Sequence, residues 1–170
     1  AGAGGGAQPA SADPISVVRA DSLFCVRINS LTGTMGKIDQ FLTGVSPIGV
    51  SMIVPAQLGK LLGGTEPKGI NMSGSFAIFG PLPGGDKPDL KRIAVLVPMS
   101  DYKQFTQGNP NVVPPDAQGI AAIGKEQPMF VATEGPGFAL VTPLNNRQAL
   151  IETKKLIAGP GATALVKRLS

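Results

Sequence analysis

Short stretches of alternating or continuous apolar residues predict most of the β-strands. In the stretch DSLFCVRIN, Phe24, Val26 and Ile28 fall on one face, which we expect to be the buried face. Residues 74–80 and 91–98 predict a β-hairpin with a long loop, and its second strand is apolar on both faces, as in a central strand. Three more strands are predicted in AQGIAAIG, QPMFVAT and GFALVTP.

Apolar residues spaced by three and four predict the first two helices. Over residues 31–45 this spacing gives one stripe of an amphipathic helix, with Ser30 as its N-cap. The stripe consists of Leu31, Met35, Ile38, Leu42 and Val45. A second helix is expected to follow Pro55, with its leucines facing inward and Gly63 and Gly64 ending it.

Two further helices are predicted in the second half of the chain. SDYKQF is expected to form a short capped helix, and Asn145 or Asn146 is expected to cap the last helix. The resulting order of elements predicts an α+β fold, a largely antiparallel sheet with helices packed on one face and an extended N-terminal tail. Residues 1–19 form the Gly/Ala-rich tail, and residues 20–170 form a single domain.

Composition indicates surfaces that become covered. Hydrophobic residues make up 42% of the 170 residues and charged residues only 15%, so the uncovered sheet face is expected to meet a partner. The net charge of +4 is scattered, and there are one Tyr and no Trp, so we expect no nucleic-acid partner. No stretch approaches the roughly 20 apolar residues of a membrane span.

Residue types that carry chemistry are scarce. The chain has no His, and its carboxylates are spread singly, so we predict no catalytic site, no metal site and no cofactor. The single cysteine, Cys25, lies in an apolar stretch and is interpreted as a small core residue. The string Ser100 to Lys103 has the S-x-x-K spacing of a serine nucleophile, but it lacks the supporting K-T-G and S-D-N motifs. A helix cap is the preferred interpretation.

The first residues raise the question of compartment. The chain begins with small residues and no Met, as after signal-peptide cleavage, so export to the cell surface, the extracellular space or the periplasm is expected. The alternative is a fragment or proteolytic product. A short β-prone run is predicted to add a strand to the sheet edge of a neighbouring copy, or to fold back over its own domain. Its members are Pro14, Ile15, Ser16, Val17 and Val18.

Three stretches share a pattern of strand, helix and hairpin: ADSLFCVRINSLTGTMGKIDQFL, GINMSGSFAIFG and AVLVPMSDYKQF. Together they resemble a family of exported bacterial, planctomycete-like proteins of unknown function. The resemblance includes a P-x-S-D-Y-x-x-F turn into a helix, and implies roles in the turn, the cap and packing. The residues concerned are Pro98, Ser100, Asp101, Tyr102 and Phe105.

These patterns favour a secreted structural protein that assembles with copies of itself, as a filament or a surface layer, through its tail and sheet edges. The alternative is an exported module that binds a ligand or the cell wall. An enzyme using Ser100 and Lys103 is the third hypothesis.

Overall fold

A computed structural model describes residues 18, 24–43, 49–80 and 92–157, with side chains up to residue 152. Most of the predicted tail, the end of the first predicted helix at Gly44 and Val45, and the long hairpin loop lie outside the described residues. So does the end of the chain from residue 158 onward.

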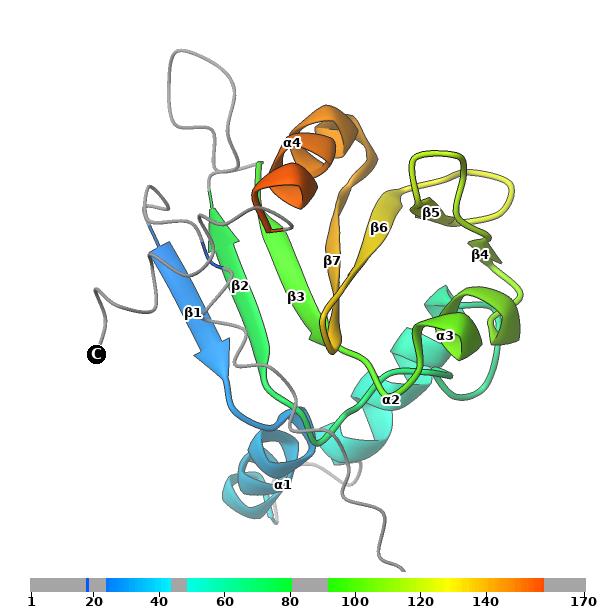
Figure 1. Cartoon of the computed structure of the whole chain (residues 1–170). Coiled ribbons are helices and arrows are strands. Elements are labelled where there is room, and N and C mark those ends of the chain that lie inside the picture. The colour runs from blue at the N-terminus through cyan, green and yellow to red at the C-terminus, as the bar shows by residue number, and fades with distance from the viewer. Residues whose placement is uncertain (1–17, 19–23, 44–48, 81–91, 158–170) are drawn as a thin grey trace, which may run out of the picture.

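Within the described residues, seven antiparallel strands form one sheet in the order β1-β2-β3-β7-β6-β5-β4 (Figure 1). Their alternating sequences favour extended backbone, and the chain turns between neighbouring strands β2 and β3, β4 and β5, β5 and β6, and β6 and β7. The strands are β1 (Phe24–Ile28), β2 (Phe76–Gly80), β3 (Ala94–Pro98), β4 (Val112–Val113), β5 (Ile120–Ile123), β6 (Phe130–Gly135) and β7 (Phe138–Pro143). The predicted α+β class with an antiparallel sheet is confirmed.

Four α-helices accompany the sheet in the described part of the chain. They are α1 (Leu31–Phe41), α2 (Val50–Leu61), α3 (Tyr102–Gly108) and α4 (Arg147–Ile157). Both candidate capping asparagines of the last helix lie in a 3₁₀ turn, Leu144–Asn146, which leads directly into α4. The helical run therefore starts earlier than the sequence pattern predicts.

The helices cover both faces of the sheet, which corrects the expectation that they gather on one face. On the first face, Phe79, Leu96 and Leu140 form a buried core with Leu150 of α4. On the other face, the second half of the sheet packs against α3 and the end of α2. The central strands are apolar on both faces, so each face requires a cover.

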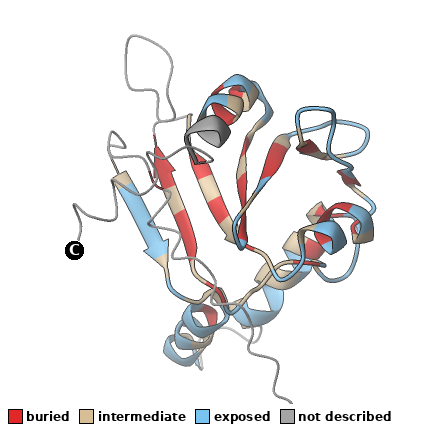
Figure 2. Cartoon of the chain, in the orientation of Figure 1, coloured by how far each residue is buried: buried red, intermediate tan, exposed pale blue. Residues whose placement is uncertain are grey.

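Edge strand β1 is exposed, contrary to the prediction for its apolar face (Figure 2). Val26 is aligned with Ile78 of β2, yet it is 54% exposed. Cys25 is exposed as well, so its interpretation as a core residue is wrong. Burial on an edge strand depends on a neighbouring layer, and none of the described helices covers β1.

Helix α2 begins at Val50, not after Pro55, so the predicted start is wrong. The backbone N–H groups of Val50 and Ser51 donate to the carboxylate of Asp39, which supplies the missing cap from α1. Pro55 lies inside the helix and removes one internal hydrogen bond. The cap comes from eleven residues upstream, so no local signal marks this boundary.

Candidate functional site

An apolar groove lies between helix α2 and the sheet face opposite α4. Fourteen described residues line a cavity of about 310 Å³, and all of them have apolar side chains. Leu31, Val54 and Leu58 line it from the helices, and Val95 and Val97 line it from β3. Because no polar atom lines this cavity, it can accept an apolar group and offers no hydrogen bond to a polar one.

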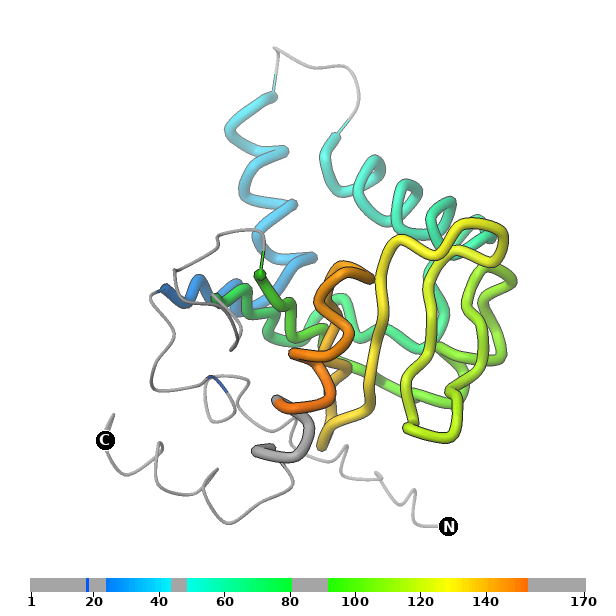
Figure 3. Tube along the Cα trace, turned by 90° about the horizontal axis from the view of Figure 1, so that it is seen from above, coloured from blue at the N-terminus to red at the C-terminus, as the bar shows by residue number. Residues whose placement is uncertain are grey.

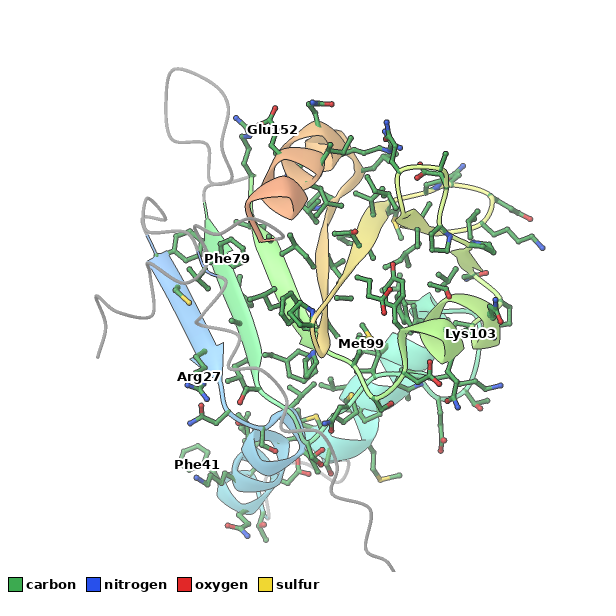
Figure 4. The ribbon with its side chains drawn as sticks, viewed as in Figure 1. Arg27, Phe41, Phe79, Met99, Lys103 and Glu152 are labelled. Atoms are coloured by element: carbon green, nitrogen blue, oxygen red, sulfur yellow. The ribbon has the colours of Figure 1, made fainter. Side chains whose placement is uncertain are left out.

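The sequence produces this groove because β3 is apolar on its second face as well. Ala94 and Leu96 of β3 are buried toward α4, whereas Val95 and Val97 on the groove side are only half-buried. Met99, where β3 leads toward α3, also lines the groove (Figure 4). An enclosed, empty apolar cavity of 310 Å³ would cost about 7 kcal/mol at roughly 24 cal/mol per Å³. The groove avoids this cost only if it stays open to water or is filled.

Helices α1 and α2, which we call the arm, project to one side of the sheet (Figure 3). The Ser30 hydroxyl accepts from the N–H of Gly33, and so caps α1 as predicted. The Thr32 N–H and hydroxyl both donate to the Met72 carbonyl at 3.1 Å, which ties the base of the arm to the chain before β2. The arm is therefore attached to the domain at its base, and the Asp39 cap holds its two helices together.

The arm also carries exposed apolar side chains, which we call the arm patch. They are Ile38 and Phe41 of α1 and Met52 and Ile53 of α2. Phe41 is 86% exposed and Met52 is 71% exposed, and Figure 4 shows the Phe41 ring outside the body of the domain. Single exposed apolar residues are common, but here four lie on two helices that pack together, which makes the arm a candidate interaction surface.

The P-x-S-D-Y-x-x-F residues lie together at the junction of β3 and α3. Asp101 is the N-cap of α3, and its carboxylate accepts from the Gln104 N–H at 3.0 Å. Phe105 is buried, and the half-buried Tyr102 ring lies 5.9 Å from the Phe105 ring. Burial and the charge of Glu134 raise the pKa of Tyr102 to about 12, so this phenol stays protonated at neutral pH. Pro98 is the last residue of β3 and pairs with Phe138.

Ser100 and Lys103, the S-x-x-K pair, do not form a recognisable catalytic site. Ser100 and Lys103 are both exposed, and no described group hydrogen-bonds to the Ser100 hydroxyl. The Ser100 N–H donates to the Gly69 carbonyl at 2.9 Å, so the backbone of Ser100 helps fix the turn before α3. Ser100 therefore belongs to the turn, and the predicted cap is supplied by the next residue, Asp101.

Buried polar side chains in the described part are bound within the fold. Thr133 donates to the Gly119 carbonyl, Thr142 donates to the Ile93 carbonyl, and Asn109 bridges to Lys68.

Partial burial raises the pKa of the Cys25 thiol, which makes it a weaker nucleophile at neutral pH. No group of three acidic, His or Cys side chains among the described residues is placed to hold a metal ion.

Of the predicted linking strand, only Val18 is described. It is buried in its own chain's core beside Ala77 and Phe79, so the hypothesis that Val18 docks on a neighbour is wrong for this residue. An apolar side chain at this position fills the sheet face that α4 covers only in part. Pro14, Ile15, Ser16 and Val17 lie outside the described residues.

We compared the chain with protein-family models, curated proteins and solved structures. Nothing matches. The resemblance to exported planctomycete-like proteins therefore stays a prediction, and the function must be inferred from the groove and the arm patch. In the described part of the chain, no helix is long and apolar enough to cross a membrane.

The cap that joins α2 to α1 within the arm is expected to weaken in acid. Hydrogen bonds from Ser51 and from the Val50 N–H hold the pKa of Asp39 below its usual range. Their contribution is present above the unfolded-state pKa of about 3.9 and is lost as the pH falls through the lower folded-state value. The protection of the amides in the first turn of α2, taken relative to their intrinsic exchange rates at the same pH, should therefore fall below about pH 4.

The matched variant is Asp39→Asn, which removes the charge and keeps one acceptor. At pH 6 its first α2 turn should exchange faster than in the natural sequence, and this difference should narrow at pH 3. Identical exchange at pH 6 would show that the carboxylate does not hold α2.

Proposed function

We propose that this chain is a non-enzymatic structural subunit that assembles with copies of itself through its arm. The exposed arm patch, together with the apolar groove between α2 and the sheet, is the observation that carries the proposal. Surfaces of this kind mark protein interaction sites, whereas scattered exposed apolar residues do not. Export belongs to the proposal on the strength of the family resemblance alone.

The free energy gained by burying the arm patch can be compared with the free-energy cost of association. Full burial of a Val, Leu, Ile, Phe or Met side chain gains about 1.5–3 kcal/mol, so the four arm-patch side chains supply at most about 6–12 kcal/mol per copy. A two-fold interface uses this gain twice, once from each subunit. Association costs about 4–15 kcal/mol in lost freedom of motion. The largest gain available from the arm patch is therefore of the same order as the cost of association.

This proposal moves the assembly surface from the tail to the arm. Val18 is committed to its own core, so a linking strand formed by the whole predicted run is not retained. The outer edge of β1 stays a candidate secondary contact, because no described strand pairs with it.

A second candidate function is an exported module that binds an apolar ligand. The groove itself favours it, since its volume of about 310 Å³ lies in the range of small-molecule sites. Such sites usually include a few polar groups that orient the ligand, and this groove has none. A hydrocarbon chain suits the groove, whereas a cell-wall sugar or peptide does not.

Sedimentation across a range of concentrations tests self-assembly. We expect the mass of the natural sequence to rise with concentration, and Met52→Ser to shift this rise to higher concentration. The matched control is Met129→Ser, because Met129 is also exposed but lies before β6, outside the arm. A monomer at every concentration, or equal effects of the two variants, would contradict the proposal.

A further inference from the structure

We propose that two copies exchange arms, so that Phe41 of each copy fills the apolar groove of the other. This inference rests on the proposed self-assembly and specifies its interface. The groove needs an apolar occupant without hydrogen-bond donors or acceptors, and a phenylalanine ring meets that requirement. Phe41 is the most exposed large hydrophobic side chain among the described residues.

Phe41 is badly placed to fill the groove of its own copy. It is the last residue of α1, whereas Leu31, the first residue of the same helix, lines the groove. At 1.5 Å per residue, their Cα atoms lie about 15 Å apart along the helix axis. Along α2 the groove lining runs from Val54 to Leu61, so Met52 lies just beyond its outer end. Phe41 lies at the outer end of α1, away from the lining residue of its own helix.

A second copy accounts for both features at once. The arm projects from the sheet (Figure 3). A two-fold axis that passes midway between Phe41 and the groove of one copy therefore brings the Phe41 of each copy to the groove of the other. A hydrocarbon ligand would fill the groove and leave the arm patch in water. The described part of the arm carries few charges, namely Lys37, Asp39 and Lys60, so little charge must be desolvated on docking.

Complementation between two variants tests the exchange. Phe41→Ser removes the inserted side chain and keeps the groove, whereas Val54→Arg keeps Phe41 and places a charged side chain in the groove. Val54 is half-buried, so the arginine head can reach water without unfolding α2. If this variant does not fold, Val54→Asn is the milder substitution.

The expected dimer affinities follow from counting contacts. With about 30-fold in Kd for each lost insertion, typical of an interface hot spot, either variant alone loses both and dimerises about 1,000-fold more weakly. A mixture of the two variants restores one insertion, so its heterodimer should be only about 30-fold weaker than the natural dimer. Val113→Arg, on exposed strand β4, is the matched control and should leave Kd unchanged.

The measurement uses Cys25, the single cysteine of the chain, which is exposed and takes a donor or acceptor dye. Energy transfer that appears on mixing Phe41→Ser with Val54→Arg, and not in either alone, supports arm exchange. If the natural sequence associates but mixing restores nothing, the exchange is wrong while self-assembly stands. Association of Phe41→Ser at natural strength, with an apolar dye bound to the groove and lost in Val54→Arg, would instead favour a hydrocarbon ligand. A monomeric natural sequence overturns both proposals.

Discussion

Replacement of Phe79 by alanine is expected to lower the free energy of unfolding by about 3–5 kcal/mol, the range for deleting a buried aromatic side chain. Phe79 is 0% exposed and belongs to the core between the sheet and α4, with Leu96, Leu140 and Leu150. Removal of the ring leaves a cavity. Strand β2 is hydrogen-bonded to β1 on one side and to β3 on the other, so it cannot easily move to close this cavity. Urea denaturation followed by circular dichroism measures this loss.

Phe41→Ala provides the control with the same change of residue type. Because Phe41 is 86% exposed, its replacement should change the free energy of unfolding of the monomer, measured at concentrations too low for association, by no more than about 0.5 kcal/mol. The two variants should therefore separate the functions of the two rings, one in folding and the other in association. Equal losses of stability would show that Phe41 packs within its own copy.

Local patterns were sufficient to predict most of the elements. The alternation along β2, β3, β6 and β7 identified the strands, because each side chain's face follows directly from the two-residue period. The Ser30 cap was also predictable, since its hydrogen bond to Gly33 spans only three residues.

Features that depend on distant contacts could not be predicted. The start of α2 is set by the Asp39 carboxylate of another helix. Exposure of Cys25 and Val26 follows from the edge position of β1, which its own sequence does not reveal. The division of helices between the two faces is likewise a property of packing, and the order of elements alone did not determine it.

The groove could not be predicted for the same reason, although one of its walls could be recognised in the sequence. Val95 and Val97 predicted a second apolar face on β3, which indicated that something must cover it. The position of α2 determines how much of this second face of β3 is covered. Phe41 was a further signal, because it is a large apolar residue outside the stripe that includes Met35 and Ile38.

Gly69→Ala is expected to destabilise the domain by about 2–5 kcal/mol, from backbone strain and steric overlap together. Gly69 has φ +77°, and an added Cβ would lie 2.3 Å from the Asp101 carbonyl oxygen and 2.4 Å from the Phe105 backbone nitrogen. Its carbonyl accepts from the N–H groups of Ser100 and Asp101, so the strain falls on the start of α3.

The damage should extend from Gly69 to the groove, because Phe105 of α3 lines it. We therefore expect Gly69→Ala to weaken self-association as well as folding, with both losses measured on the same preparation by sedimentation and urea denaturation. Gly36→Ala is the matched control: Gly36 lies inside α1, and an added Cβ would meet no atom within 4 Å. It should raise stability by about 0.5–1 kcal/mol, because alanine favours the helix over glycine. If Gly69→Ala proved as harmless as Gly36→Ala, the close approach of Gly69 to α3 would not exist in solution.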